Sequence, residues 1–170
     1  MAISRLNHAV LYVRDAERSA AFYRDVLGFR VVMAMGDRAV FLQAPDSTND
    51  HDLGLFSIGD AAGASPAGRA TVGLYHLAWE VRTLADLATV RDDLAGAGAL
   101  VGASDHGTTK SLYGQDPDGL EFEIVWLIPA DRIDDRILQA KTTIRPLDLD
   151  AEIERFGADT LGGIGISVSA

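Results

Sequence analysis

Two histidines and one glutamate of this chain stand where they could bind a divalent metal ion. His8 lies in RLNHAVLYV and His76 in LYHLAWEV, segments whose alternating pattern predicts strands. Glu123 lies in a third such segment, LEFEIVWL. Successive side chains of a strand point to opposite faces, so each of the three residues shares the face opposite the one expected to pack under helices. Nitrogen and oxygen ligands would therefore line one side of the fold.

An internal repeat relates the two histidines to each other. A shift of 68 positions pairs His8 with His76, and a shift of 72 pairs Phe41 with Tyr113. Repeats of this kind mark one structural unit used twice. A lone histidine on a strand usually has a structural role, but two at equivalent positions, with a carboxylate facing the same way, favour a metal site. Two imidazoles and one carboxylate leave half an octahedron free, as in non-haem Fe(II) oxygenases.

Each half of the repeat reads as strand, helix and three strands. We therefore predict an α+β fold of two tandem βαβββ modules, at about 4–58 and 72–127, which form a curved, barrel-like mixed sheet around the metal site. The first helix should begin at Asp15 and end at Gly28. We expect its apolar face to carry Ala21, Phe22, Val26 and Leu27.

A tail follows the two modules. We assign residues 1–128 to one domain and 129–170 to a C-terminal helical tail. Within the tail, ADRIDDRILQA and DAEIERFG are expected to be helices.

The run DPDGLEFEI, together with the paired modules and the histidine near the start of each, resembles the vicinal oxygen chelate superfamily. Its members include glyoxalase I, type I extradiol dioxygenases, fosfomycin-inactivating thiol transferases and metal-free bleomycin-binding proteins. The resemblance covers about residues 4–128. It implies that His8, His76 and Glu123 are the metal ligands.

Finer features resemble the extradiol dioxygenases. In HDLGLF, His51 matches an active-site histidine outside the ligand set, and Tyr113 in KSLYGQ matches a tyrosine that binds the metal-bound substrate oxygen. The resemblance implies Fe(II), with Mn, Ni or Zn as other candidates, and a small aromatic diol and O₂ as substrates. One further family histidine is missing where Thr108 or Thr109 stands. His106, slightly earlier in the chain, is the candidate to replace it.

The other activities of the superfamily fit less well. A glyoxalase-like lyase needs a fourth ligand, a glutamate in the last strand of the first module, where this chain has LGLFSI. Asp52 at the edge of that strand is the only nearby acid, and a turn or strand end explains it. A fosfomycin-type thiol transferase should carry a cation near Ala103. A metal-free small-molecule binding or resistance protein would not need the three ligands together.

Composition limits the remaining possibilities. A formal net charge of −10 over 170 residues argues against nucleic acid and anionic membranes as partners. The absence of cysteine excludes thiolate ligands and disulfides. We expect a cytoplasmic homodimer, because no signal or membrane segment is seen in the sequence and superfamily members often pair.

Overall fold

The computed structural model describes residues 2–3, 5–67 and 70–163, and it divides into two compact units. The first comprises Met1–Pro66 with the turn Asp116–Leu120, and the second comprises Ala67–Gln115 with Glu121–Ala170.

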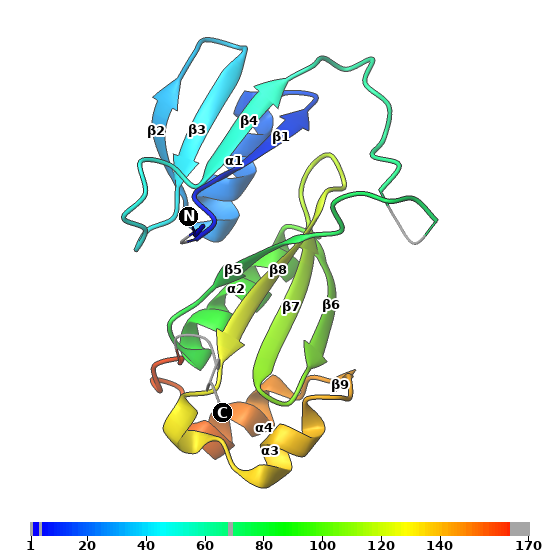
Figure 1. Ribbon diagram of the computed structural model, residues 1–170. Helices are drawn as coiled ribbons and strands as arrows, with labels where there is room; N and C mark the ends of the chain where they lie inside the picture. Colours follow the sequence, from blue (N-terminus) through cyan, green and yellow to red (C-terminus); the bar gives the residue numbers. More distant parts are fainter. Residues whose placement is uncertain (1, 4, 68–69, 164–170) are drawn as a thin grey trace. The chain divides into compact units, whose positions relative to one another are not determined.

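The first unit contains one βαβββ module. Its elements are β1 (Ala9–Val13), α1 (Ala16–Leu27), β2 (Arg30–Ala34), β3 (Ala39–Gln43) and β4 (Leu53–Ser57). They form an open four-stranded sheet in the order β1-β4-β3-β2, in which β1 and β4 are parallel and the other pairs antiparallel (Figure 1). The predicted module is confirmed.

Helix α1 begins and ends where the sequence predicts, but it packs through a different face. The Asp15 side chain accepts hydrogen bonds from the first turn, and Gly28 ends the helix with a φ of 73°, which only glycine adopts readily. The residues buried against the sheet are Ala16, Ser19, Ala20 and Tyr23, whereas those expected there are only half-buried. The expected face was wrong because small residues let the helix approach the sheet closely, which pattern alone does not reveal.

The second unit repeats the module and adds the tail. Its module consists of β5 (Leu77–Glu80), α2 (Leu84–Gly96), β6 (Leu100–Asp105), β7 (Thr109–Gln115) and β8 (Glu121–Leu127). The tail contains the 3₁₀ helix η1 (Ala130–Arg132), α3 (Asp135–Ala140), β9 (Arg145–Pro146) and α4 (Leu149–Phe156). The strand order β5-β8-β7-β6-β9 reproduces that of the first unit, with the unpredicted β9 added at one edge (Figure 1).

The tail packs onto the second module. The single helix expected over 130–140 is broken, because Asp134 caps a new helix by accepting a hydrogen bond from the Ile137 N–H. In α4, the ring of Phe156 lies 5.6 Å from that of the fully buried Trp126, whose indole N–H donates to the Thr160 carbonyl. The tail therefore completes the core of this unit.

Strand alternation settles which face of each sheet is buried. In β1, Leu11 and Val13 are buried while Val10 and Tyr12 are exposed. In β8, Phe122 and its alternate neighbours are buried, and Glu123 lies on the opposite, half-buried face. The predicted faces of β1 and β8 are thus confirmed, and in β5 Leu77 and Trp79 are half-buried while Ala78 and Glu80 are exposed.

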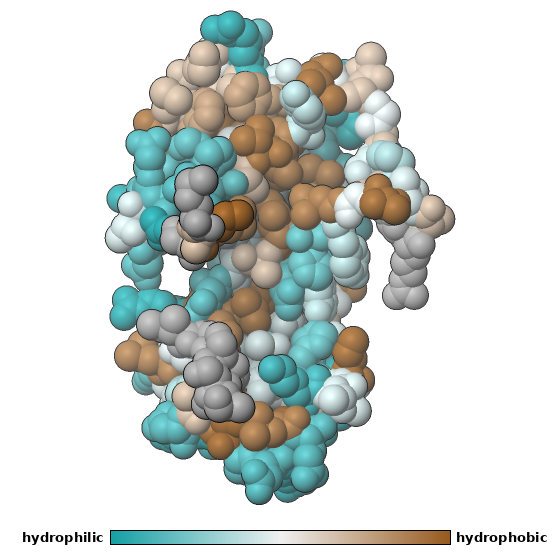
Figure 2. Space-filling view, in the orientation of Figure 1, coloured by the Kyte–Doolittle hydropathy of each residue, from teal (hydrophilic) through white to brown (hydrophobic). Residues whose placement is uncertain are grey.

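Apolar side chains also reach the surface of the first unit, where Val31, Val32 and Met33 of β2 are about half exposed. Figure 2 shows apolar residues on the surface of this part of the chain. Across the described residues, no helix is both long and apolar enough to cross a membrane.

Candidate functional site

His76 and Glu123 converge in the second unit because of strand register. His76 directly precedes β5, and β5 runs parallel to β8 with Ala78 paired to Glu123. Nε2 of His76 lies 3.1 Å from Oε2 of Glu123. Both side chains are largely buried, with 25% and 14% of the side-chain surface exposed. Two ligand atoms of the predicted metal set therefore point at one another.

This distance fits a shared metal ion. Bonds of about 2.0–2.2 Å at right angles place neighbouring ligand atoms about 2.8–3.1 Å apart. Nδ1 of His76 is buried and has no hydrogen-bond partner among the described residues, so the polar contact of this imidazole is the one between Nε2 and Glu123. The donor set, one imidazole nitrogen and one carboxylate oxygen, suits Fe(II), Mn(II) or Zn(II).

Tyr113 lies beside this pair. In the antiparallel pairing of β7 with β8, Tyr113 stands directly opposite Glu123, and its ring centroid is 5.9 Å from that of His76. Burial, and next the negative charge of Glu123, raise the pKa of the Tyr113 phenol above its usual value, against the smaller opposite effect of the nearby Ser104 and Ser111 hydroxyls. The phenol is therefore a hydrogen-bond donor throughout the neutral range.

His106 reaches the Tyr113 hydroxyl. It lies in the turn between β6 and β7, and its Nε2 is 2.9 Å from the hydroxyl oxygen. Thr108 is buried in the same turn, and Thr109 is the first residue of β7. The sequence left open whether His106 or one of the two threonines takes the place of the further family histidine. The imidazole of His106 is the group next to the tyrosine hydroxyl. Its catalytic role stays a prediction.

The first unit holds a second group of aromatic and imidazole rings. His8 directly precedes β1, as His76 precedes β5, and its ring centroid lies 4.5 Å from that of His51. His51 also contacts Phe41 edge-on at 5.1 Å, and its Nδ1 lies 3.0 Å from Asp50 Oδ2. His51, the active-site histidine that the resemblance implies, is therefore adjacent to the predicted ligand of this unit.

Asp52 has a structural role, as expected. It is 7% exposed and accepts hydrogen bonds from the Ala44 N–H, the Ser47 hydroxyl and the Asn49 amide. These bonds close the loop before β4 and fix the backbone next to His51. Its carboxylate oxygens are thereby occupied.

Gly54 occupies the place in the first module that Glu123 has in the second. Val10 pairs with Gly54 as Ala78 pairs with Glu123, and Phe41 lies opposite Gly54 as Tyr113 lies opposite Glu123. A Cβ at position 54 would lie 3.4 Å from the Phe41 ring. The first module therefore provides no carboxylate at the position of a fourth ligand.

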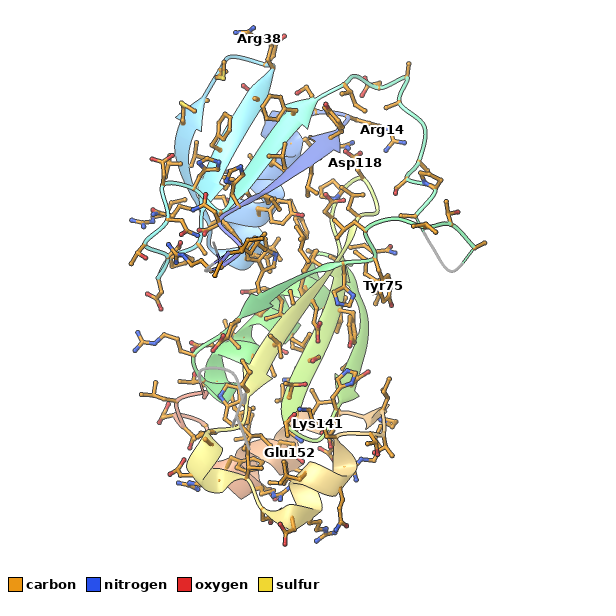
Figure 3. The ribbon with its side chains drawn as sticks, in the orientation of Figure 1. Arg14, Arg38, Tyr75, Asp118, Lys141 and Glu152 are labelled. Carbon is orange, nitrogen blue, oxygen red and sulfur yellow. The ribbon has the colours of Figure 1, made fainter. Side chains whose placement is uncertain are left out.

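The DPDG motif forms the turn Asp116–Leu120. Asp116 accepts hydrogen bonds from the Asp118 and Leu120 N–H groups, and Arg14 donates to Asp118 through its backbone and its guanidinium (Figure 3). Burial would raise the pKa of Asp118, but the hydrogen bonds from Arg14 and the charge of Arg18 hold it below the usual value. In this structure the motif has a structural role, as a charged turn.

The predicted site residues thus form two groups. His76, Glu123, Tyr113 and His106 meet in the second unit, and His8 meets His51 in the first. Within the described parts of the chain, neither unit alone gathers three His, Asp or Glu side chains around one point. The complete ligand triad stays a prediction.

Two aromatic residues of these groups were not predicted as site residues. The ring of Tyr75 lies 4.6 Å from that of His76, and Phe41 packs on His51. The sequence could have indicated Phe41 as a site residue, because the repeat aligns it with Tyr113. For Tyr75 the only indication in the sequence was its position next to His76.

The raised pKa of Tyr113 gives a spectroscopic prediction. We expect its phenol to ionise above pH 10, and Glu123→Gln to lower that pKa because it removes a negative charge opposite the ring. Since the folded state holds this proton longer than the unfolded chain does, the tyrosine's contribution to stability falls as pH rises above about 10. Tyrosinate absorbance, taken as the difference between the protein and Tyr113→Phe, measures the titration. Glu121→Gln, on the same face of β8, is the matched control, and an equal shift in both variants would contradict the assignment.

Two proteins similar to this chain are dioxygenases. The chain is 29% identical over 128 residues to the manganese-dependent 2,3-dihydroxybiphenyl 1,2-dioxygenase of Geobacillus genomosp. 3, covering 73% of this chain and 37% of that protein. It is 31% identical over 121 residues to the catechol-2,3-dioxygenase of Bacillus subtilis strain 168, covering 71% and 41%. The chain thus spans about two-fifths of the length of these relatives.

Solved structures support the fold. The glyoxylase/bleomycin resistance protein/dioxygenase domain from Frankia sp. EAN1pec superposes with a TM-score of 0.62 at 23% identity, over 76% of this chain and 96% of that one. The family model described as Glyoxalase/Bleomycin resistance protein/Dioxygenase superfamily matches residues 5–124. With this match, two βαβββ modules and a histidine at the start of each, the chain belongs to the glyoxalase/bleomycin resistance/dioxygenase superfamily.

Proposed function

We propose that this chain is an extradiol dioxygenase that opens the ring of a catechol-type diol with O₂ at a divalent metal ion, Fe(II) in the first instance. The observation that carries the proposal is the 3.1 Å approach of His76 Nε2 to Glu123 Oε2 with Tyr113 directly opposite the glutamate. The two dioxygenases to which the chain is similar support it.

The number of ligands favours this reaction over the lyase reaction. In the proposed site His8, His76 and Glu123 hold the ion, and Gly54 leaves the first module without a fourth ligand. When bound, the ion would supply adjacent open positions where a diol and O₂ bind together. The protein then has to position the diol and move its protons.

Tyr113 and His51 are the residues suited to those tasks. The phenol of Tyr113 keeps its proton at neutral pH and donates a hydrogen bond to the substrate oxygen that carries most charge. His106, at 2.9 Å, orients that hydroxyl. His51 accepts and returns a proton beside His8, as imidazole can near neutrality.

Oxygen consumption tests the proposed reaction. We expect the protein reconstituted with Fe(II) under anaerobic conditions to consume O₂ with catechol, 3-substituted catechols or 2,3-dihydroxybiphenyl and to form a yellow ring-opened product. Reconstitution with Mn(II) in parallel distinguishes the metal. Methylglyoxal with glutathione, and fosfomycin with a thiol, are the control substrates.

The control reactions decide between activities. If a control substrate is turned over and the diols cause no O₂ uptake, the activity is that of a lyase or a thiol transferase and not of a dioxygenase. Tight diol binding without metal or turnover would instead indicate a binding protein. The expected homodimer stays a prediction, which light scattering on the same sample measures.

A further inference from the structure

A polar cavity of about 410 Å³ lies in the second unit, where the turn between β6 and β7 meets the tail helices. Six charged side chains line it, four cationic and two anionic: Lys110, Arg136, Arg145, Arg155, Asp105 and Glu152. Lys110 alternates along β7 with the residues on the face of Tyr113 and therefore lies on the opposite face of the sheet. The cavity is thus distinct from the candidate metal site.

Strand register builds the floor of this cavity. Asp105 of β6 pairs with Lys110 of β7 on one side and with Arg145 of β9 on the other. Lys110 Nζ lies 2.6 Å from Asp105 Oδ1, and Arg145 donates to Asp105 Oδ2 at 3.1 Å. Burial would raise the pKa of Asp105, but hydrogen bonds from Lys110 and the Gly107 N–H hold it below its usual value.

The lysine at the floor of the cavity is buried and paired with two carboxylates. Lys110 has only 1% of its side chain exposed, and a buried ammonium is stable only when it is paired. Glu152 of α4 lies close to the lysine, 3.1 Å from Nζ to Oε2 (Figure 3 labels Glu152). That oxygen is buried and has no directed hydrogen-bond partner in the described residues. The floor therefore contains a carboxylate oxygen that is ion-paired with Lys110 but accepts no hydrogen bond from the described residues.

The rim of the cavity carries two arginines, Arg136 and Arg155. Arg136 and Arg155 are exposed, and neither has an ion-pair partner within the described ranges. The guanidinium of Arg155 lies 4.7 Å from the centre of the Phe156 ring, which holds it in place. In a protein of net charge −10, two free guanidinium groups over a charged floor form a local site of attraction for anions.

We propose that this cavity binds a small oxyanion, phosphate or carboxylate, that also carries a hydroxyl group. Arg136 and Arg155 bind the anionic oxygens, since guanidinium groups match the geometry of carboxylate and phosphate. The hydroxyl of the ligand donates to Oε2 of Glu152, which is ion-paired with Lys110 and still accepts no hydrogen bond from the described residues. Hydrogen phosphate and hydroxycarboxylates share this chemistry.

Four probes separate the parts of this recognition. Hydrogen phosphate and sulfate have the same shape, but sulfate has no hydroxyl, and malate differs from succinate in the same way. We expect calorimetry on the full chain, at millimolar ligand and constant ionic strength, to show saturable binding of phosphate or malate and weaker binding of its partner. Whichever of phosphate and malate binds more tightly shows whether the ligand is a phosphate or a hydroxycarboxylate. Equal binding of the two members of each pair would overturn the role of Glu152.

Variants tie the binding to the cavity. The double variant Arg136→Gln/Arg155→Gln should weaken binding about tenfold or more, because charge-assisted hydrogen bonds are lost. Glu152→Gln should remove the preference for the hydroxylated probe. Arg132→Gln, an exposed arginine of η1 outside the lining, is the matched control and should bind normally. Unaltered affinity in the double variant, whose fold circular dichroism checks, or no saturable binding by the unmodified protein, would overturn the proposal.

Discussion

Glu123→Gln is expected to lower the affinity for Fe(II) and Mn(II) by more than about 100-fold, since residues outside the ligand shell already contribute 10–100-fold. The amide keeps the size of the side chain but loses its charge. The carboxylate faces Nε2 of His76 at 3.1 Å, so its replacement removes one of two converging ligand atoms. Metal content after anaerobic reconstitution, together with equilibrium dialysis, measures the loss.

Glu121→Gln is the matched control for this variant. Glu121 lies two residues earlier on the same half-buried face of β8, pairs with Gln115 and is not a proposed ligand. It should bind metal like the unmodified protein. If both variants lose metal equally, the loss comes from the lower negative charge on this face of β8 and not from the removal of a ligand. If neither loses metal, Glu123 is not a ligand.

His51→Ala is expected to reduce turnover of the diol by about 10²–10⁴-fold while metal content stays the same. The ring of His51 packs between His8 and Phe41, with ring centroids 4.5 and 5.1 Å away. It has 17% of its side chain exposed, enough for proton exchange with solvent or substrate. Removing the imidazole leaves the proposed ligands in place and removes the acid/base.

Turnover and metal content must be measured on the same preparation of His51→Ala. Thr48→Ala, at an exposed position of the same loop, controls for disturbance of the loop and should retain activity. Parallel loss of metal and activity in His51→Ala would make His51 a support for His8 and not an acid/base. Full activity would remove it from the mechanism.

Both experiments depend on features that the sequence already determined. Alternation along LEFEIVWL assigned Glu123 to the less buried face of β8, as observed, and the repeat paired His8 with His76, which precede β1 and β5. These patterns can be read from sequence because the direction of a strand side chain depends only on its neighbours in the chain. Caps are equally local, so Asp15 and Gly28 marked the ends of α1 correctly.

The sequence was less informative wherever packing decided the outcome. It placed Phe22 and Val26 on the apolar face of α1, but the residues that the structure buries include Ala16, Ala20 and Tyr23. It also predicted one tail helix where Asp134 starts a second one. Apolar pattern counts side chains but does not measure how closely a helix can approach a sheet.

Only the tertiary structure decided which residues face each other across strands. Pairing register joins segments far apart in the chain, and a slip of one residue would turn every side chain to the other face. Register places Tyr113 opposite Glu123 and Gly54 in the equivalent place of the first module. It also buries Lys110 beside Asp105. The segment KSLYGQ, which begins with this lysine, has the pattern of an ordinary strand and gives no sign of the burial. A charge that would be exposed on an isolated strand is stable there because its partners arrive from other strands and from the tail.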